Sequence, residues 1–325
     1  MTQWQGRVAL VLGTSTGGIG SHVADLARGL VAGGAEVTVC GPAETAPRFD
    51  ATGAAFSPVK IVSGAHPAHA RAVAALGRVL AATDPQVVHA HGLRAGLVAA
   101  LAAKRRPLVV TWHNAVITRG LRGGASRLAE RIVARAADVT LAASEDLAAR
   151  AAAVGAADVR LAPVAAPLLP PPTRGRAAVR AELRVGADTP LVLSVGRLHP
   201  QKGYDVLIAA AARWRELRPR PAVVIAGQGP SYLDLTARIS ATRAPVTLLG
   251  HRDDVADLLE AADLAVVTSV WEARQLFAQE AMRAGVPLVA TAVGGLPGLV
   301  GDAAVLVPPG DVDALDQAVG RLLDD

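Results

Sequence analysis

The sequence contains one cysteine, few aromatic residues and no long apolar run. Cys40 has no second cysteine to pair with, which excludes an intramolecular disulfide and fits a reducing cytoplasm. Phe, Trp and Tyr make up 3% of the chain, so Val, Leu, Ile and Ala must build the cores. No apolar stretch reaches roughly 18 residues, so we predict no membrane span. The polar N-terminal segment also lacks the layout of a signal peptide.

Lysine is equally scarce, with Lys60, Lys104 and Lys202 as its only occurrences. Up to Pro167 the chain carries 17 Lys and Arg against 10 Asp and Glu, and beyond it 16 against 18. A basic first half attracts phosphates, nucleic acid or an anionic membrane surface. Nucleic acid is the weakest of these, because the Arg residues are scattered and few aromatic side chains lie among them for base stacking. We therefore expect no nucleic acid partner, and we expect a cytoplasmic protein with peripheral contact at the inner membrane face.

Short aliphatic runs alternate with helix-length amphipathic segments throughout the chain. This alternation is typical of parallel βαβ units, and strands that are apolar throughout indicate a sheet covered on both faces. The 325 residues are also more than one core usually holds. The predicted strands are 7–13, 35–40, 86–91, 107–113, 138–144, 190–197, 221–229, 244–250, 262–269, 286–291 and 303–310.

A proline cluster within residues 164–176 interrupts this rhythm, and proline continues neither a ladder nor a helix interior. We therefore predict an N-terminal domain over 1–167, a linker over 168–173 and a C-terminal domain over 174–325. Each domain should be a Rossmann-like, doubly wound α/β unit. Ligands bind outside the carboxyl ends of the strands in such sheets, so the site is expected in a cleft that the two domains face.

A glycine-rich turn follows the first strand and precedes a helix predicted to begin near Ser21. Glycines stand at 13, 17, 18 and 20, so the dinucleotide fingerprint is absent, and the second strand ends without an acid for a ribose. These two features count against an NAD enzyme. We predict that the backbone at Gly17 and Gly18 contacts a phosphate, although a tight strand–helix turn needs glycine in any case.

A second motif, "GRLHPQKGYDV", follows the strand at 190–197. Arg197 and Lys202 lie beside the start of a helix predicted near Tyr204. Two cations at a helix N-terminus are suited to a diphosphate, and the retained lysine suggests a need for a compact charge.

A third motif places two acids in apolar surroundings. Glu272 lies in the loop after the strand at 262–269, and Glu280 lies on a helix predicted over 275–284. Eight residues at helical rise separate them by at most roughly 12 Å. That separation is too long for a shared proton, but it matches the distance between the sugar and the ribose of a nucleotide-sugar.

These motifs, together with "AGQGP" and "HRDDVADLLEAADLAVVTS", resemble the retaining glycosyltransferases of family 4, which have the GT-B fold. The resemblance covers nearly the whole chain. It implies that Glu280 binds the donor ribose, that Glu272 binds the donor sugar, and that Arg197 and Lys202 neutralise the leaving diphosphate. It also implies that the glycine turn closes over the phosphates.

The histidine of a "T-x-H" segment lies beside the transferring sugar in this family, so the resemblance makes His113 an active-site residue. His89 and His91 alternate on one strand and should share a face as packing groups. Arg252 lies in the loop that in the family runs beside the nucleobase. We assign no individual role to His22, His66, His69, His199 and His251.

No metal site is expected, because no nearby Asp, Glu or Cys completes a histidine set. The acids of Asp311-x-Asp313 resemble a metal motif, but they stand at a helix start, where one of them should cap the helix. Family members of this fold do not generally need a metal, and we expect no cofactor.

The resemblance implies a retaining, metal-independent hexosyltransferase that uses a nucleotide-sugar donor and an acceptor hydroxyl. The basic first half favours a lipid-linked or otherwise anionic acceptor. The segment "EARQLF" departs from the glycine- and aromatic-rich family pattern, so Arg274 and Gln275 should alter which sugar is accepted. Two alternatives stay open: a catalytically silent sugar-nucleotide-binding or assembly protein, and a nucleotide-sugar epimerase of the same fold.

Overall fold

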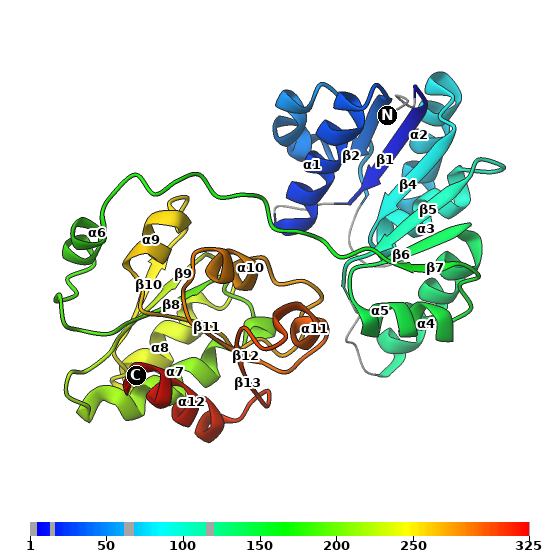
Figure 1. Ribbon diagram of the computed structural model, residues 1–325. Helices are drawn as coiled ribbons and strands as arrows, with labels where there is room; N and C mark the ends of the chain where they lie inside the picture. Colours follow the sequence, from blue (N-terminus) through cyan, green and yellow to red (C-terminus); the bar gives the residue numbers. More distant parts are fainter. Residues whose placement is uncertain (1–4, 14–16, 62–67, 115–119, 325) are drawn as a thin grey trace. The chain divides into compact units, whose positions relative to one another are not determined.

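The computed structural model describes residues 5–13, 17–61, 68–114 and 120–324. The chain divides between Pro167 and Leu168 into two compact units, each with its own parallel sheet (Figure 1). Among the helices of the described residues, none combines the length and the apolar composition that a membrane crossing requires.

The first unit contains a seven-stranded parallel sheet in the order β3-β2-β1-β4-β5-β6-β7. Its strands are β1 (Arg7–Leu12), β2 (Glu36–Gly41), β3 (Ala55–Pro58), β4 (Val87–His91), β5 (Leu108–Trp112), β6 (Val139–Ala142) and β7 (Val159–Leu161). Its helices are α1 (Gly18–Ala32), α2 (Ala68–Thr83), α3 (Leu93–Ala102), α4 (Gly120–Ala136) and α5 (Glu145–Ala153), with a 3₁₀ segment at Ala43–Thr52.

The second unit contains a six-stranded parallel sheet in the order β10-β9-β8-β11-β12-β13. Its strands are β8 (Leu191–Val195), β9 (Ala222–Ala226), β10 (Val246–Gly250), β11 (Leu264–Val267), β12 (Leu288–Thr291) and β13 (Val305–Val307). Its helices are α6 (Arg176–Glu182), α7 (Tyr204–Arg213), α8 (Tyr232–Thr242), α9 (Val255–Ala261), α10 (Leu276–Arg283), α11 (Leu296–Val300) and α12 (Val312–Asp324), with 3₁₀ turns at Pro200–Lys202 and Trp214–Glu216.

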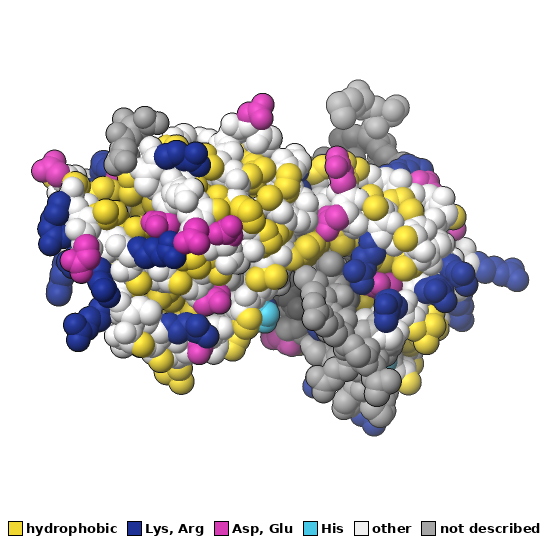
Figure 2. Space-filling view, turned by 90° about the horizontal axis from the view of Figure 1, so that it is seen from below, with side chains coloured by type: hydrophobic (Ala, Val, Ile, Leu, Met, Phe, Trp, Pro, Cys, Tyr) yellow, Lys and Arg dark blue, Asp and Glu magenta, His cyan; other side chains and the backbone are white. Residues whose placement is uncertain are grey.

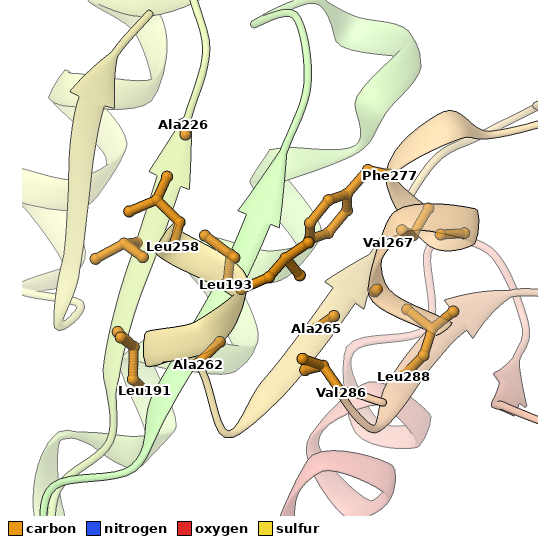
Figure 3. Close-up of a cluster of buried hydrophobic side chains, with 14 of the residues drawn as sticks. Leu191, Leu193, Ala226, Leu258, Ala262, Ala265, Val267, Phe277, Val286 and Leu288 are labelled. Atoms are coloured by element: carbon orange, nitrogen blue, oxygen red, sulfur yellow. The ribbon is translucent and has the colours of Figure 1, made fainter. Parts of the chain in front are cut away.

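Both faces of the second sheet are covered, as its apolar strands predicted. Leu191 and Leu193 belong to a core cluster with residues of α9 and α10, among them Phe277 (Figure 3). Val192 points to the opposite face and packs with residues of α7 and α12. The alternation of neighbouring residues between two buried faces explains why the whole strand is apolar.

All the predicted strands are present, and the sequence analysis missed two short ones. β3 and β7 lie at the two edges of the first sheet. β3 has no buried residue, and β7 exposes Arg160 and Leu161. An edge strand with an exposed face lacks the apolar run that identifies a central strand.

The observed starts of two helices differ from the predicted ones. α1 begins at Gly18, earlier than the predicted Ser21. α10 begins at Leu276 because the side chain of Gln275 accepts a hydrogen bond from the Phe277 N–H at 2.7 Å. Asp311 accepts from the Ala314 N–H at 2.9 Å before α12, which confirms the predicted capping role.

Charged side chains of both signs lie on one face of the surface. On the face drawn in Figure 2, described Lys and Arg side chains lie interspersed with Asp and Glu. This mixed surface agrees with the scattered Arg residues of the sequence.

Candidate active site

The order of the second sheet changes direction between β8 and β11, which places a topological switch point there. Arg197 and Lys202 follow β8, and Ser269 and Glu272 follow β11. The Thr268 hydroxyl donates a hydrogen bond to the Lys202 carbonyl at 3.0 Å. Two motifs that lie far apart in the sequence therefore share one site at the carboxyl ends of these strands.

Lys202 and Glu272 form an ion pair at this site. The distance from Lys202 Nζ to Glu272 Oε1 is 2.6 Å, and the Ser269 hydroxyl donates to the same oxygen at 2.8 Å. The two side chains are only 19% and 12% exposed, so water screens this charge-assisted contact weakly. In the described part of the chain Glu272 Oε2 has no hydrogen-bond partner, which leaves this oxygen able to accept from a ligand.

Two glycines allow the backbone to pack tightly around these residues. Gly203 has φ +61°, and a Cβ there would lie 2.1 Å from the Thr268 carbonyl oxygen. Gly294 has φ +53°, and a Cβ there would lie 2.0 Å from the Glu272 carbonyl oxygen. The next residue, Gly295, donates its N–H to that carbonyl at 2.8 Å. Only glycine meets both the left-handed conformation and the close approach.

Arg197 provides a second, exposed cation beside Lys202. Among the described residues, the Arg197 guanidinium has no hydrogen-bond or ion-pair partner. Burial lowers the pKa of His199, and the charges of Arg197 and Lys202 lower it further. Both cations therefore act on the same small region, which can accept an anionic group.

Burial shifts the pKa of two charged side chains in and just before α10. Burial raises the pKa of the half-buried Glu280, and Arg283 partly opposes that shift. Arg274 precedes the helix, and its buried Nε has no hydrogen-bond partner among the described residues. Burial alone lowers the pKa of this guanidinium. Groups perturbed by desolvation near a strand end are typical of a ligand site.

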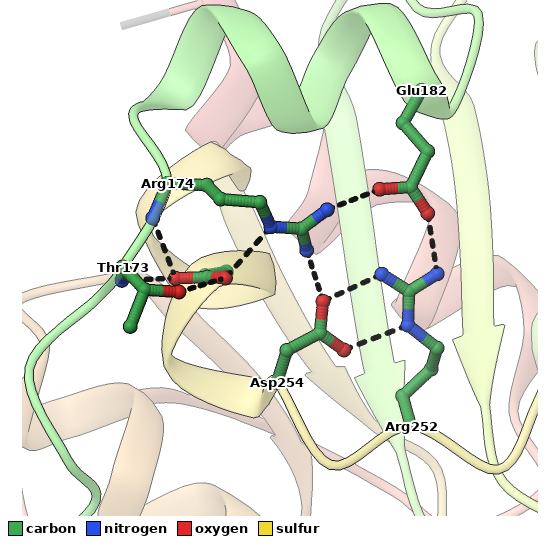
Figure 4. Close-up of polar contacts among 6 residues, drawn as sticks. Thr173, Arg174, Glu182, Arg252 and Asp254 are labelled. Atoms are coloured by element: carbon green, nitrogen blue, oxygen red, sulfur yellow. Dashed lines mark hydrogen bonds and ion pairs between the residues drawn. The ribbon is translucent and has the colours of Figure 1, made fainter.

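Arg252, the residue predicted to lie beside a nucleobase, belongs to an ion-pair network (Figure 4). It donates to Asp254 at 2.7 and 2.6 Å and to Glu182 at 2.7 Å. Arg174 pairs with both of these acids and with Asp257. The Arg252 side chain therefore connects α6 to the loop before α9, and its contact with a base stays a prediction.

Four histidines gather at the switch point of the first sheet, between β1 and β4. His91 Nδ1 and His113 Nε2 lie 3.1 Å apart, and His89 Nε2 lies 2.7 Å from the Thr111 hydroxyl. The rings of His89 and His91 are 4.2 Å apart, as expected for residues on one face of a strand. His22, on α1, meets both His91 and His113 edge to face.

Burial keeps these imidazoles neutral near pH 7. Desolvation, with smaller contributions from the neighbouring histidines, lowers the pKa of His89 to about 4 and that of His113 to about 3. The pKa of the fully buried His91 falls well below the ordinary value for the same reasons. His113 therefore presents a neutral ring at the end of β5, with a lone pair on one nitrogen.

The predicted phosphate turn leads into the N-terminus of α1. Gly17 is the N-cap residue in an extended conformation, and a Cβ there would meet nothing within 4 Å. Gly18 is the first residue of the helix, and the first turn contains no acid. The positive end of the helix dipole suits an anion. Residues 14–16 of the turn lie outside the described residues.

Sequence reasoning missed two features of these sites. The Lys202–Glu272 pair joins residues separated by 70 positions, and it was not foreseen that the two motifs would neutralise one another. His22 received no role, yet it lies against His91 and His113. Its position one turn after the glycine turn was the only available signal.

Comparison with known proteins assigns both halves of the chain. Residues 17–167 match the family described as a glycosyl transferase 4-like domain, and residues 189–325 match glycosyl transferases group 1. A D-inositol 3-phosphate glycosyltransferase from Mycobacterium leprae is 34% identical over 253 residues, which are 69% of this chain and 58% of that protein. A glycogen synthase from Mycobacterium tuberculosis is 39% identical over 140 residues, 41% of this chain and 34% of that protein. The chain thus spans less than two thirds of these curated relatives.

Solved structures show the same fold at lower identity. Sucrose-phosphate synthase from Thermosynechococcus elongatus has a TM-score of 0.81 at 24% identity, covering 99% of this chain and 90% of that chain. HepE from Anabaena in complex with UDP-glucose has a TM-score of 0.83 at 21% identity, with the same coverage. With both domain families matched and two parallel-sheet α/β units observed, the chain belongs to the family 4 glycosyltransferases and has the GT-B fold.

Proposed function

We propose that this protein is a retaining hexosyltransferase that moves a sugar from a nucleoside diphosphate to an acceptor hydroxyl. The observation that carries the proposal is the cluster of Arg197, Lys202 and Glu272 at the switch point of the second sheet. Two cations and one carboxylate with a free oxygen match the diphosphate and the sugar hydroxyls of such a donor. HepE, of the same fold, has been solved with UDP-glucose, which supports this class of donor.

Departure of the diphosphate is the step that the two cations assist. The bond between the anomeric carbon and the phosphate oxygen breaks, and the electron pair stays on the phosphate. Arg197 and Lys202 stabilise this charge, and Lys202 does so from a position where water screens it weakly. Lys202 already pairs with Glu272, so its ammonium is held in place before the donor arrives.

The acids orient the two ends of the donor. Glu272 Oε2 accepts a hydrogen bond from a hydroxyl of the sugar. The hydrogen bond from Ser269 to Oε1 holds the carboxylate in position. Glu280, on α10, accepts hydrogen bonds from the ribose hydroxyls. Arg274 lies between them in the sequence, and its guanidinium without a counter-charge selects among donor sugars.

The first unit contributes the acceptor side of the reaction. The backbone at Gly17 and Gly18 holds the phosphates at the start of α1, and the neutral ring of His113 accepts or donates a hydrogen bond to the transferring sugar. The acceptor proton passes to the departing phosphate oxygen, and the new glycosidic bond forms on the face that the phosphate leaves. No metal or cofactor takes part.

The acceptor is an anionic or lipid-linked molecule. Up to Pro167 the chain has 17 basic against 10 acidic residues, and several relatives at about a third identity are named for an acceptor that carries phosphate. The same charge supports peripheral contact with an anionic membrane. Sedimentation with vesicles tests this contact: binding should require anionic lipid and fall as salt rises, and binding to neutral vesicles would contradict it.

A screen of donors tests the function directly. Thermal melts with UDP-, GDP-, ADP- and TDP-sugars should show one nucleotide class that raises the Tm, because a ligand that binds the folded state stabilises it. Transfer to an acceptor panel, followed by NMR of the product anomer, should show retained configuration in the presence of EDTA. Inversion would contradict the retaining mechanism. Stabilisation by a nucleotide without any turnover would instead indicate a silent sugar-nucleotide-binding protein.

A further inference from the structure

Three histidines converge at the switch point of the first sheet from different parts of the chain. His22 comes from α1, His91 is the last residue of β4, and His113 follows β5. One ring nitrogen from each lies within 4.8 Å of the other two. His91 and His113 are buried at 3% and 6% exposure, and His22 is half-buried.

The three rings are arranged as ligands of one ion would be. Their centroids form a nearly equilateral triangle with sides of 5.7, 5.3 and 5.4 Å. Zinc–nitrogen bonds of about 2.0–2.1 Å in a tetrahedral site would hold three imidazole centroids about 5.2 Å apart. The 3.1 Å between His91 Nδ1 and His113 Nε2 is also close to the nitrogen–nitrogen edge of about 3.4 Å in such a site. Binding an ion therefore requires ring adjustments on the order of 1 Å.

One buried nitrogen of this cluster lacks a hydrogen-bond partner within the described part of the chain. His91 Nε2 is buried and has no hydrogen-bond partner among the described residues. Nδ1 is the His91 nitrogen that approaches His113, so Nε2 lies on the other edge of the ring and is not a ligand of the same ion. The His89 ring packs against the His91 ring in a tilted arrangement with centroids 4.2 Å apart, and His89 Nε2 lies 2.7 Å from the Thr111 hydroxyl.

We propose that His22, His91 and His113 bind one divalent transition-metal ion of the Zn²⁺ class. Imidazole nitrogen suits Zn²⁺ and its neighbours in the series, whereas Mg²⁺ and Ca²⁺ require oxygen ligands. Three protein nitrogens leave a fourth position open to water or an anion. The sequence analysis looked for an acid or a cysteine to complete a histidine set, whereas this proposal uses three imidazoles alone.

Occupancy of this site opposes sugar transfer, a consequence that rests on the proposed function. The ion occupies one ring nitrogen of His113, so that nitrogen can no longer accept a hydrogen bond from the transferring sugar. Transfer itself needs no metal, so the ion acts as an inhibitor that a chelator removes.

Cobalt absorption tests the site independently of catalysis. The full chain is freed of metal with EDTA, desalted and titrated with Co²⁺, whose visible absorption is far stronger in a tetrahedral site than in a six-coordinate one. We expect one Co²⁺ per chain, displaced by one Zn²⁺. The His22→Gln variant should bind at least tenfold more weakly. His251→Gln, at an exposed histidine of the second unit, should bind as the wild type does.

The choice of variant separates binding from folding. His22 is half-buried on a helix, so His22→Gln should keep the melting curve of the metal-free wild type. Equal affinity of the wild type and His22→Gln, or only the weak absorption of six-coordinate Co²⁺, overturns the proposal. If the chain transfers sugar, micromolar Zn²⁺ should inhibit the wild type more strongly than His22→Gln. Metal binding without any transfer would leave the metal site intact and count only against the proposed function.

Discussion

At the scale of single residues, Lys202 contributes most to the proposed chemistry. It is one of three lysines in the chain, and it pairs with Glu272 at 2.6 Å beside the exposed Arg197. Lys202→Ala should lower kcat by about 10²–10³, the loss typical when one preorganised donor to a developing charge is removed. Steady-state kinetics with the donor identified by thermal shift measure this.

The matched control for Lys202 is Arg238→Ala. Arg238 is an exposed cation of the same unit that pairs with Asp234 one helical turn away. Its loss should leave kcat unchanged, because surface pairs of this kind contribute little. A Lys202→Ala variant that is folded and turns over at the wild-type rate removes the diphosphate assignment.

Glu280 should lower the stability of the folded chain at pH 7 and should be needed for donor binding. Burial raises its pKa above the ordinary 4.5, so the folded chain holds a proton there more readily than the unfolded chain does. Its contribution to stability is therefore fully present below that ordinary value and is lost as pH rises through the raised pKa. Glu280→Gln should raise the Tm at pH 7 and leave it unchanged near pH 4, and it should abolish donor-induced stabilisation.

Melting curves at the two pH values, with and without donor, separate these effects for Glu280. Asp302→Asn, at an exposed acid of the same unit, serves as the control and should alter neither the Tm nor donor binding. Full donor binding by Glu280→Gln would refute the ribose role while leaving the electrostatic argument in place.

At the scale of elements, the loop around Glu272 depends on the turn that leads into α11. Gly294 has φ +53°, and a Cβ would lie 2.0 Å from the Glu272 carbonyl oxygen. Gly294→Ala should therefore lower the free energy of unfolding by about 2–4 kcal/mol. Urea unfolding measures the loss. Gly298→Ala, on α11 with nothing within 4 Å of its Cβ, should be neutral or stabilising by up to about 1 kcal/mol.

Residues 173 and 174, at the end of the linker, are fastened to α9 through one buried acid. Asp257 accepts hydrogen bonds from the Thr173 N–H at 2.6 Å and from Arg174 Nε at 2.9 Å, and these partners, Arg174 foremost, lower its pKa to about 2. The resulting stabilisation is present above the ordinary pKa of 3.8 and is lost as pH falls towards 2. Asp257→Asn should therefore have a lower Tm than the wild type at pH 6. This difference in Tm should be smaller at pH 2.

The control for this acid is Asp234→Asn, which removes an exposed ion pair on α8. Its melting curves should follow those of the wild type across the same pH range. If Asp257→Asn and the wild type have the same Tm at every pH, the contact of Asp257 with the linker contributes no stability.

At the scale of the whole molecule, each unit contains its own sheet and its own core. Arg197, Lys202, Glu272 and Glu280 all belong to the second unit. A fragment of residues 168–325 should therefore bind the nucleoside diphosphate, measured by isothermal titration calorimetry, while transferring no sugar. Transfer by the fragment alone would contradict the role given to His113. The first unit alone should bind the donor far more weakly than the fragment does, because it offers only the glycine turn at Gly17 and Gly18.

The local pattern of residues already predicted most of the architecture. Alternating apolar and amphipathic segments identified the strands, because each central strand is buried on two faces and must be apolar along its length. The same pattern located Arg197 after β8 and Glu272 after β11. It missed β3 and β7, whose exposed edge positions carry no such pattern.

Contacts between distant segments depended on the order of the strands in the sheet. The sequence alone identified the fold class, the division into two units and the motifs that resemble family 4. Only the tertiary structure paired Lys202 with Glu272, engaged Arg252 with Asp254, and brought His22 against His91 and His113. The physical reason is distance along the chain. The periodicity of apolar residues indicates which side of a local element is buried. These contacts, in contrast, form where parallel strands from distant parts of the sequence end side by side.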